Sequence, residues 1–315
     1  MPNVATQVEV GHTGLKIPLM GLGTAGMGDL YIKIEQCAAA EMVNYALDHG
    51  INLIDTAPHY GRGVAETRLG LALEGIERSR FTISTKVGFG YNAEGEWASD
   101  FSRDSIMRSL EGSLKRLKVN HVDIVHLHDP DKHYHQALTE SFPALAELRS
   151  QGVIKAIGAG MNQWEMPVLF AREADFDCFL LAGHYTLLDQ DALDQFLPVC
   201  LEKGISVFMA GILNTGILAT GAVPGAKYRY RDASPEIMQR VARIEAVCRQ
   251  FDVPLNAAAT QFPLGHPAVT AVVVGADTAQ HIAANLKALE TAIPAEFWQT
   301  LKAEGLLNSS VPTPV

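Results

Sequence analysis

The sequence predicts an α/β protein built as a (β/α)8 TIM barrel, preceded by a short N-terminal β-hairpin. Short apolar runs alternate eight times with amphipathic stretches, and the connections between them are short. Such alternation requires parallel strands joined by right-handed crossovers. Eight units fit a closed barrel better than the alternative, a doubly wound open sheet, which usually has fewer strands.

Each element of this barrel has its own local signal. Residues 6–10 and 15–17 flank a glycine-bearing turn, which predicts the hairpin. Ser102 and Asp191 stand near the starts of the third and sixth helices and are typical helix-start residues. The predicted strands are 19–23, 51–55, 81–86, 122–128, 154–159, 178–182, 206–210 and 271–275. The predicted helices are 36–48, 65–74, 103–117, 136–150, 164–173, 189–202, 235–251 and 278–289.

Composition limits the function classes. The chain has 315 residues, of which 48% are hydrophobic and 19% charged, enough for a large core. Length alone would suit two domains, but the barrel pattern predicts one domain spanning 1–315. A net charge of -10 argues against nucleic acid or an anionic membrane as the partner. Four scattered cysteines, no signal-peptide pattern and no long apolar run predict a cytoplasmic protein.

Polar side chains end three of the predicted strands. Asp55, Lys86 and His128 are the last residues of their runs, and Tyr60 follows Asp55 after a sharp turn. Because the carboxyl ends of barrel strands meet at one mouth, we expect these four side chains to converge there. A charged group at that position is costly unless it is paired, so Asp55 is expected to hold Lys86 beside Tyr60.

These residue types can transfer a proton. A free tyrosine has a pKa near ~10, and an adjacent ammonium stabilises the phenolate and is expected to lower that pKa. Tyr60 would then protonate a carbonyl oxygen or take a proton from a hydroxyl, while His128 orients the reacting oxygen. None of the four accepts a hydride, so a nicotinamide cofactor must. His126 is expected to be a buried histidine satisfied by a neighbour.

Several motifs resemble those of the aldo-keto reductases, in the family's order and over residues 7–290. They are residues 20–24, 52–61, 84–86, 127–130, 154–158 and 272–276, with Asn285 downstream. The resemblance implies a catalytic tetrad of Asp55, Tyr60, Lys86 and His128, with Tyr60 as acid or base. The alternative for Asp55 and Lys86 is an ion pair that only stabilises the barrel.

The same resemblance implies a set of cofactor contacts. Asn162 takes the amide-binding role with an offset of one residue, while Ala182 and Ala210 replace a glutamine and a stacking tyrosine of relatives. Residues 212–216 resemble the turn that meets the cofactor pyrophosphate. The full set is Gly23, Thr24, Asp55, Asn162, Ile212, Leu213, Asn214, Gly216, Gly275, Asp277, His281 and Asn285.

Cofactor preference is predicted from charge. Many relatives hold the 2′-phosphate of NADPH with a lysine and an arginine, and those places here are Gly275 and His281, with Asp277 nearby. Because a carboxylate repels a phosphate, we predict NAD over NADP. Lys227, Arg229 and Arg231, in the loop 211–233, either cover the pyrophosphate when the loop closes or form a solvated basic segment.

Residues 158–162, 185–189 and 212–218 most resemble the sugar dehydrogenase branch, which contains the L-fucose, D-threo-aldose and L-galactose 1-dehydrogenases. The resemblance implies oxidation of the anomeric hydroxyl of an aldose such as L-fucose to a lactone. His59, Tyr91 and Trp97 would contact this small-molecule substrate.

Alternatives remain open within the same resemblance. They are pyridoxal 4-dehydrogenase, an NADPH-linked general aldehyde reductase and a non-catalytic redox-sensing subunit. No metal is expected, because the crowded residues 126–135 lack a zinc-binding spacing. The sequence leaves the oligomeric state open.

Overall fold

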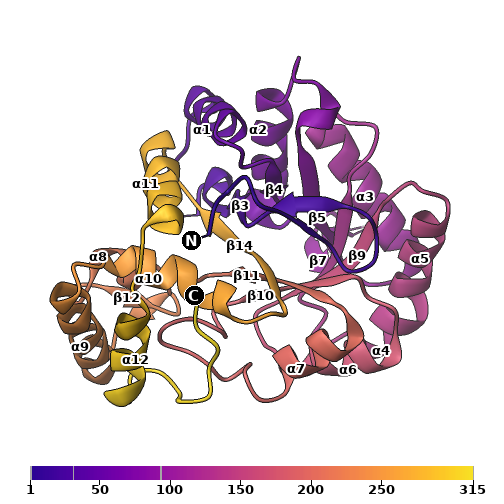
Figure 1. Cartoon of the computed structure of the whole chain (residues 1–315). Helices are drawn as coiled ribbons and strands as arrows, with labels where there is room; N and C mark the ends of the chain where they lie inside the picture. Colours follow the sequence, from indigo (N-terminus) through magenta and orange to yellow (C-terminus); the bar gives the residue numbers. More distant parts are fainter. Residues whose placement is uncertain (1, 31, 93, 315) are drawn as a thin grey trace.

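Eight parallel strands close into a barrel in chain order (Figure 1). The computed structural model describes residues 2–30, 32–92 and 94–314. The predicted barrel is confirmed, and the doubly wound sheet is excluded because the last strand pairs with the first. The strands are β3 (Met20–Gly23), β4 (Leu53–Asp55), β5 (Thr82–Val87), β8 (Ile124–His128), β9 (Ala156–Met161), β10 (Cys178–Ala182), β11 (Ser206–Ala210) and β14 (Val269–Gly275).

Helices surround the barrel (Figure 1). Most match the predicted ranges, and Ser102 caps the third helix by accepting the N–H of Ser105 at 3.4 Å. The surrounding helices are α1 (Gln36–Asp48), α2 (Val64–Ala72), α3 (Arg103–Leu117), α4 (Tyr134–Gln136), the π-helix η4 (Ala137–Ser141), α5 (Phe142–Ser150), α6 (Glu165–Glu173), α7 (Phe196–Lys203), α8 (Ile217–Thr220), α10 (Leu255–Gln261) and α11 (Ala279–Glu290).

The start of one predicted helix was wrong, and one helix was missed. The predicted helix 189–202 begins only at Phe196, because turns occupy the preceding residues and Asp191 pairs with His184 instead of capping. The stretch 235–251 is a helix, α9 (Pro235–Gln250), but it packs against α12 (Ala295–Ala303) and α10. The helix before the last strand is α10, which packs against α11. This alanine-rich helix is only seven residues long and is buried along most of its length, so hydrophobic periodicity missed it.

The predicted hairpin closes the end of the barrel opposite the strands' carboxyl ends. It consists of β1 (Gln7–Glu9) and β2 (Lys16–Pro18). The N–H of Gly11 donates to the hydroxyl of Ser206, the first residue of β11, at 2.9 Å. The hairpin adds Val10, Leu15 and Ile17 to the apolar cluster inside the barrel, which also contains Leu53, Ile124, Ala156, Cys178, Leu180, Phe208, Ala271 and Val273.

In the part of the chain that the structure describes, two small hairpins and four 3-10 turns lie in the connections. One hairpin, β6 (Phe89–Tyr91) and β7 (Trp97–Ser99), follows β5 at the carboxyl-end mouth. The other, β12 (Lys227–Tyr228) and β13 (Arg231–Asp232), lies in the long loop after β11. The turns are η1 (Ala25–Gly28), η2 (Tyr60–Gly63), η3 (Arg78–Arg80) and η5 (Phe262–Gly265).

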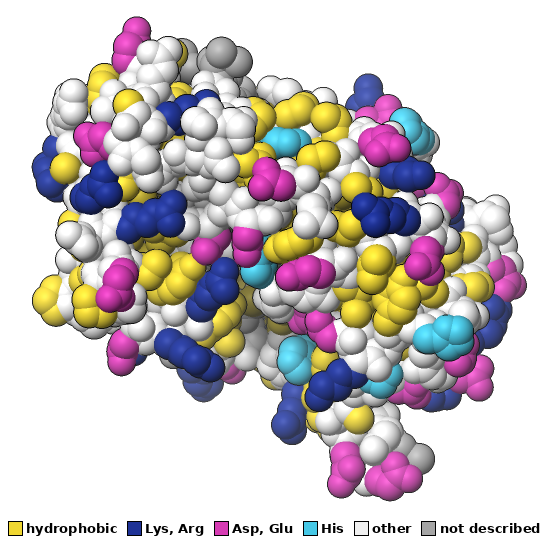
Figure 2. Space-filling model, turned by 90° about the horizontal axis from the view of Figure 1, so that it is seen from below, with side chains coloured by type: hydrophobic (Ala, Val, Ile, Leu, Met, Phe, Trp, Pro, Cys, Tyr) yellow, Lys and Arg dark blue, Asp and Glu magenta, His cyan; other side chains and the backbone are white. Residues whose placement is uncertain are grey.

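For the described residues, the surface charge distribution and the helix lengths give no sign of a special partner. On the face shown in Figure 2, basic and acidic side chains are interspersed, with no extended patch of one sign. Among the described residues, no helix is long and apolar enough to span a membrane.

Candidate active site

A buried ion pair joins the ends of two neighbouring strands. Lys86 Nζ lies 2.7 Å from Asp55 Oδ2, and both side chains are almost completely buried. Asp55 also accepts the hydroxyl of Ser84 at 2.9 Å, while Lys86 donates to the carbonyl of Thr56 at 2.9 Å. The alternation of β4 and β5 turns these polar residues inward, as the sequence predicts.

Tyr60 stands beside this pair. Lys86 Nζ donates to the phenol oxygen of Tyr60 at 3.0 Å, so Asp55, Thr56 and Tyr60 occupy all three N–H groups of the ammonium. The phenol enters from η2, where the chain crosses η1 so closely that a Cβ on Gly28 would lie 2.6 Å from the carbonyl carbon of Tyr60. A Cβ on Gly61 would lie 2.5 Å from the carbonyl oxygen of Gly28. The two glycines therefore allow the approach that places the phenol.

The pKa of Tyr60 differs from the sequence expectation. Burial raises this pKa above its ordinary value, and the charge of Lys86 offsets only part of that effect. The expected net lowering is therefore wrong, because removing the phenol from water disfavours the phenolate more than one ammonium favours it. For Lys86, burial disfavours the charge, but Asp55 and then Tyr60 hold its pKa above the ordinary value. Tyr60 is accordingly a phenol at neutral pH.

His128 approaches the same point from the end of β8. Its ring lies edge-on to that of Tyr60, with 5.9 Å between ring centroids. Burial first, and then the charge of Lys86, lower the pKa of His128 well below its ordinary range. A neutral imidazole beside the phenol can exchange hydrogen bonds with a reacting oxygen without adding charge. The structure thus brings Asp55, Tyr60, Lys86 and His128 together.

His126 differs from its expectation as well. It is fully buried inside the barrel, and neither ring nitrogen has a hydrogen-bond partner among the described residues. The expectation of a satisfying neighbour was wrong because the strand opposite it carries Gly158 and Gly160, which offer space rather than side-chain partners. A Cβ on Gly158 would lie 2.2 Å from His126 Nδ1. Burial lowers the pKa of His126 to about 3, so the ring is neutral.

An aromatic wall flanks the tetrad. The imidazole of His59 lies 4.4 Å from Phe89 and 5.7 Å from His128 between ring centroids. Trp97 Nε1 donates to His59 Nδ1 at 3.0 Å, which places the proton of a neutral His59 on Nε2. Tyr91 packs against Trp97 but is 62% exposed. Phe89 was missed at the sequence level, since only the hairpin β6–β7 brings it to His128.

Residues expected to contact the cofactor gather at the ends of β3 and β14. Thr24 is buried, and its hydroxyl donates to the carbonyl of Asp55 at 3.0 Å, so it supports the strand end. Gly23 pairs with Gly275, which is exposed and faces open space. Asp277 lies against Gly26, since a Cβ there would meet its carboxylate at 2.5 Å.

The helix that follows begins within this group. Thr278 caps α11 by accepting the N–H of His281 at 3.1 Å. Asn285, one turn further along, approaches the carbonyl of Gly275 at 3.5 Å. The exposed strand end lies beside the first turn of this 12-residue helix, whose free N–H groups are of the kind that binds phosphate oxygens.

The turn 212–216 is held by a carboxylate that the sequence analysis did not single out. Asp189 accepts the amide of Asn214 at 3.0 Å and the phenol of Tyr228 at 2.7 Å. It also pairs with Arg229 at 3.3 Å. Ile212, Leu213 and Gly216 are positioned with Asn214 in this turn. Only the fold could identify Asp189, because its partners lie 25 to 40 residues away in sequence.

The basic residues of the same loop are mostly engaged within the protein. Lys227 pairs with Asp232 at 2.6 Å across the small hairpin β12–β13. Arg229 pairs with Asp189, and Arg231 is exposed. Two of the three cations that were expected to cover a pyrophosphate therefore have carboxylate partners in this conformation.

Asn162 lies directly after β9. Its backbone N–H and its Nδ2 donate to the two carboxylate oxygens of Asp129, at 3.0 and 2.8 Å. Its carbonyl oxygen contacts His184 Nε2 at 2.9 Å. The predicted amide-binding residue thus stands at the mouth, next to the strand that carries His128.

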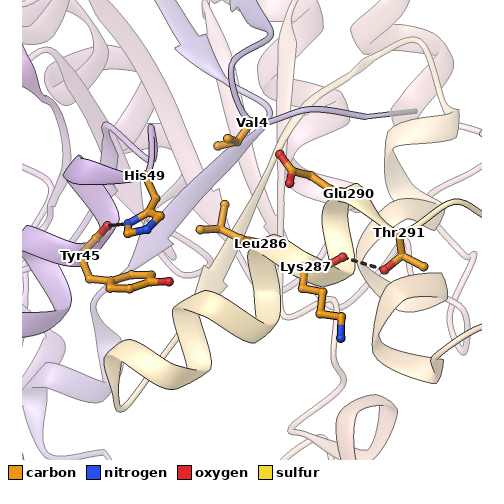
Figure 3. A pocket seen from close by; sticks show the side chains of 7 residues that line it. All are labelled: Val4, Tyr45, His49, Leu286, Lys287, Glu290 and Thr291. Atoms are coloured by element: carbon orange, nitrogen blue, oxygen red, sulfur yellow. Dashed lines mark hydrogen bonds between the residues drawn. The ribbon is translucent and has the colours of Figure 1, made fainter.

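In the part of the chain that the structure describes, two cavities lie away from the tetrad, and neither is a metal site. Among the described residues, no group of three or more His, Cys, Asp or Glu side chains could hold a metal ion. One cavity, of about 540 Å³, is lined by Val4, by Tyr45 of α1, by His49 just after α1, and by residues of α11 that include Lys287 (Figure 3). A second, of about 530 Å³, lies near the hairpin end and includes His12, Arg149 and Asp177. We place the active site at the tetrad, because a buried ion pair, a phenol and a neutral imidazole suited to proton transfer meet there.

Comparison with known proteins agrees with this geometry. The profile of the Aldo/keto reductase family matches residues 19–304. The chain belongs to this family. A pyridoxal 4-dehydrogenase from Microbacterium luteolum is 38% identical over 95% of this chain and 97% of that protein. A D-threo-aldose 1-dehydrogenase from a Pseudomonas species is 37% identical over 98% of this chain and 99% of that protein.

A solved structure of an aldo-keto reductase from Bacillus halodurans, in its holo form, superposes with a TM-score of 0.81. It covers 98% of both chains at 24% identity, and it supports the fold alone. Aldo-keto reductases are oxidoreductases that use nicotinamide cofactors.

Proposed function

We propose that this aldo-keto reductase is an NAD-dependent aldose 1-dehydrogenase, which oxidises the anomeric hydroxyl of a sugar such as L-fucose to a lactone. The observation that carries the proton-transfer chemistry is the 3.0 Å contact between Lys86 Nζ and the phenol of Tyr60, with Asp55 behind it. The similarity to a D-threo-aldose 1-dehydrogenase over 98% of the chain supports the substrate class.

Tyr60 acts as the acid or base in this proposal. In oxidation, Tyr60 reacts as the phenolate: because burial raises its pKa, the phenol first releases its own proton to water, and Lys86 stabilises the negative charge left on the phenol oxygen. The phenolate then takes the proton of the anomeric hydroxyl and becomes a neutral phenol again. His128 holds the reacting oxygen toward the phenol. A bound nicotinamide supplies the hydride acceptor.

Substrate recognition is assigned to the aromatic wall. His59, Phe89 and Trp97 present flat faces beside His128, and such faces pack well on the C–H face of a sugar ring. With its Nδ1 occupied by Trp97, His59 offers only an N–H donor, at Nε2, to a sugar oxygen. Burial and then Arg62 lower the pKa of His59, which favours this neutral form. Tyr91 extends the wall outward.

NAD is the preferred cofactor in this proposal. Residues 275–285 contain no lysine or arginine, and the carboxylate of Asp277 lies against Gly26 at the strand ends. A 2′-phosphate placed there would meet a negative charge without a cation to bind it. The same feature disfavours an NADPH-linked general aldehyde reductase.

Pyridoxal 4-dehydrogenase is the second candidate. A protein of that name is 38% identical over 95% of this chain. The aromatic wall would stack a pyridine ring as readily as a sugar face. Both candidates use the same tetrad and differ in the ring that is bound.

A substrate panel tests the proposal. Initial rates with L-fucose, other aldoses, pyridoxal and simple aldehydes are measured with NAD and with NADP. We expect aldose oxidation with NAD to have the highest kcat/KM, and Tyr60→Phe to lower kcat by about 10²-fold or more if the phenol performs acid–base work. Higher kcat/KM for pyridoxal would favour the second candidate. Absence of turnover with every substrate, together with tight NAD binding, would favour a redox-sensing subunit.

A further inference from the structure

We infer that Asp129 and His184 are positioning residues that fix the amide of Asn162, so that its Oδ1 reads the amino group of the cofactor's carboxamide. The inference rests on the proposed function, because it concerns how that site holds a nicotinamide. It assigns roles to two side chains outside the tetrad and outside the predicted cofactor contacts.

Asp129 decides which way the Asn162 amide points. Its two carboxylate oxygens face the backbone N–H of Asn162 at 3.0 Å and the side-chain Nδ2 at 2.8 Å. An ionised carboxylate only accepts hydrogen bonds, so the amide must turn its NH2 group toward Asp129. Oδ1 of Asn162 is then the amide atom that faces away from Asp129. Asn162 therefore presents Oδ1 to a ligand as an acceptor, while one of the two N–H groups of Nδ2 is committed to Asp129.

Asp129 itself is held in an uncommon conformation. Its φ is 45°, in the left-handed region that few residues other than glycine adopt. Its N–H donates to the carbonyl of Gly160 at 2.9 Å, which ties the loop after β8 to the end of β9. The Asp129 side chain is only 25% exposed, and this burial raises the pKa of its carboxyl above the ordinary value. The fold thus maintains a partly buried carboxylate whose two oxygens both serve Asn162.

His184 braces the other side of Asn162. Its Nε2 lies 2.9 Å from the Asn162 carbonyl oxygen, and its Nδ1 lies 3.0 Å from a carboxylate oxygen of Asp191. Both neighbours are acceptors, so each contact is a hydrogen bond when the facing ring nitrogen carries a proton. The backbone N–H of Asn162 is therefore held by Asp129, and its backbone carbonyl by His184.

The position of this braced amide identifies what it reads. Asn162 follows β9 at the barrel mouth, and His128, which faces Tyr60, pairs with Gly160 on the neighbouring strand. An amide oxygen at that place matches a ligand N–H donor. The carboxamide NH2 of a nicotinamide whose ring lies beside Tyr60 and His128 is such a donor. An acetyl group in the same place lacks that donor.

The test compares two cofactors in binding alone. Dissociation constants for NAD and for 3-acetylpyridine adenine dinucleotide are measured by tryptophan fluorescence or calorimetry, without substrate. We expect the wild-type protein to bind NAD about 3- to 10-fold more tightly than the acetyl analogue, the range that one hydrogen bond supplies. Asp129→Asn introduces a partner that can donate as well as accept, which lets the Asn162 amide reverse. That variant is expected to bring the ratio close to one.

Two further variants separate this role from general damage. Asp131→Asn is the matched control. Asp131 is a nearby carboxylate that accepts a hydrogen bond from Gln163 at 3.0 Å and makes none with Asn162. This variant is therefore expected to keep the wild-type ratio of the two dissociation constants. His184→Gln removes the second brace and is expected to lower the ratio in the same direction as Asp129→Asn. It also tests the inference if Asp129→Asn fails to fold. Thermal unfolding reports folding in each case.

The outcomes distinguish this inference from the proposed function. A wild-type ratio retained by both Asp129→Asn and His184→Gln would overturn the positioning role while leaving the proposed enzyme intact, and so would a wild-type protein that binds both cofactors equally. No measurable binding of NAD by the wild-type protein would overturn the proposed function itself. Loss of discrimination in the two variants, with the ratio kept in Asp131→Asn, supports the inference even if no aldose is oxidised.

Discussion

At the scale of single residues, the ammonium of Lys86 has two tasks. It neutralises the Asp55 carboxylate at 2.7 Å, and it donates to the Tyr60 phenol at 3.0 Å. A buried pair of this kind contributes little net stability compared with apolar residues, but the loss of one partner leaves an uncompensated charge. Stability and proton transfer at this site can therefore be separated by mutation.

Lys86→Met is expected to lower the free energy of unfolding by about 3–5 kcal/mol, because Asp55 loses its cation in the core. Since the Lys86 charge lowers the pKa of Tyr60 against burial, the limb of the pH–rate profile on which oxidation rises with pH should move to higher pH in this variant. The double variant Asp55→Asn/Lys86→Met should regain much of the stability but none of the activity. Denaturant unfolding and pH–rate profiles measure both; recovery of activity in the double variant would contradict the role of Lys86.

His126 makes a prediction about stability at acid pH. Its pKa is about 3 in the folded protein, against an ordinary value of 6.5. Because the folded state holds the ring neutral, its stabilising contribution is fully present above pH ~6.5 and is lost as the pH falls toward ~3, by at most about 1.4 kcal/mol per pH unit. Urea unfolding at pH 7, 6 and 5 should show a smaller loss for His126→Gln than for the wild type. His135→Gln, which changes an exposed histidine, should keep the wild-type slope; equal slopes in all three proteins would argue against this role.

At the scale of elements, the crossing of η1 and η2 positions the phenol. Gly28 and Gly61 touch through their backbones, and Arg62, with a φ of 52°, completes the turn. The segment between Asp55 and Tyr60 is thus shaped by a contact with the loop after β3, which lies about 30 residues earlier in the chain. The spacing from Asp55 to Tyr60 matters only because this contact holds.

Gly28→Ala is expected to displace η2 and to lower kcat by at least about tenfold, since a shift on the order of 1 Å at the reacting group is costly. The added methyl would lie 2.6 Å from a backbone carbon, which cannot rotate away. An overpacked site of this kind typically costs about 1–3 kcal/mol of stability. Gly90→Ala is the control, because its Cβ meets no atom within 4 Å. Equal kcat and equal unfolding midpoints for the two variants would show that the crossing does not place Tyr60.

At the scale of the whole molecule, stability and chemistry lie at opposite ends of the barrel. The hairpin β1–β2 packs Val10, Leu15 and Ile17 onto the inner cluster at one end, while the tetrad stands at the other. Barrel enzymes commonly separate the two ends in this way. Because of this separation, a substitution at the hairpin end can lower the stability of the protein without changing the active site.

Ile17→Ala should therefore lower stability by about 2–5 kcal/mol, the cost of a large-to-small change at a fully buried site. The dissociation constant for NAD should stay within about twofold, because the hairpin and the tetrad lie at opposite ends. Thermal unfolding and cofactor titration test this together. A loss of NAD affinity without a change in the unfolding midpoint would contradict the separation.

The sequence by itself determined the elements whose signal is local. The strand ends at Asp55, Lys86 and His128 follow from runs of apolar residues that alternate faces, and the β/α order then requires that those ends meet. Motifs identified the family, and a family profile confirmed it. The NAD preference and the sugar substrate stay predictions, since they depend on charges and shapes around ligands.

The tertiary structure alone decided features that depend on distant neighbours. Asp189 became an anchor for Asn214 and Tyr228, and Phe89 joined the wall beside His128, because the fold brings separate loops together. The pKa of Tyr60 rose rather than fell, because burial is a property of every group around the phenol. Local patterns specify which side of a strand a residue occupies; only packing specifies which groups it meets there and how much water is excluded.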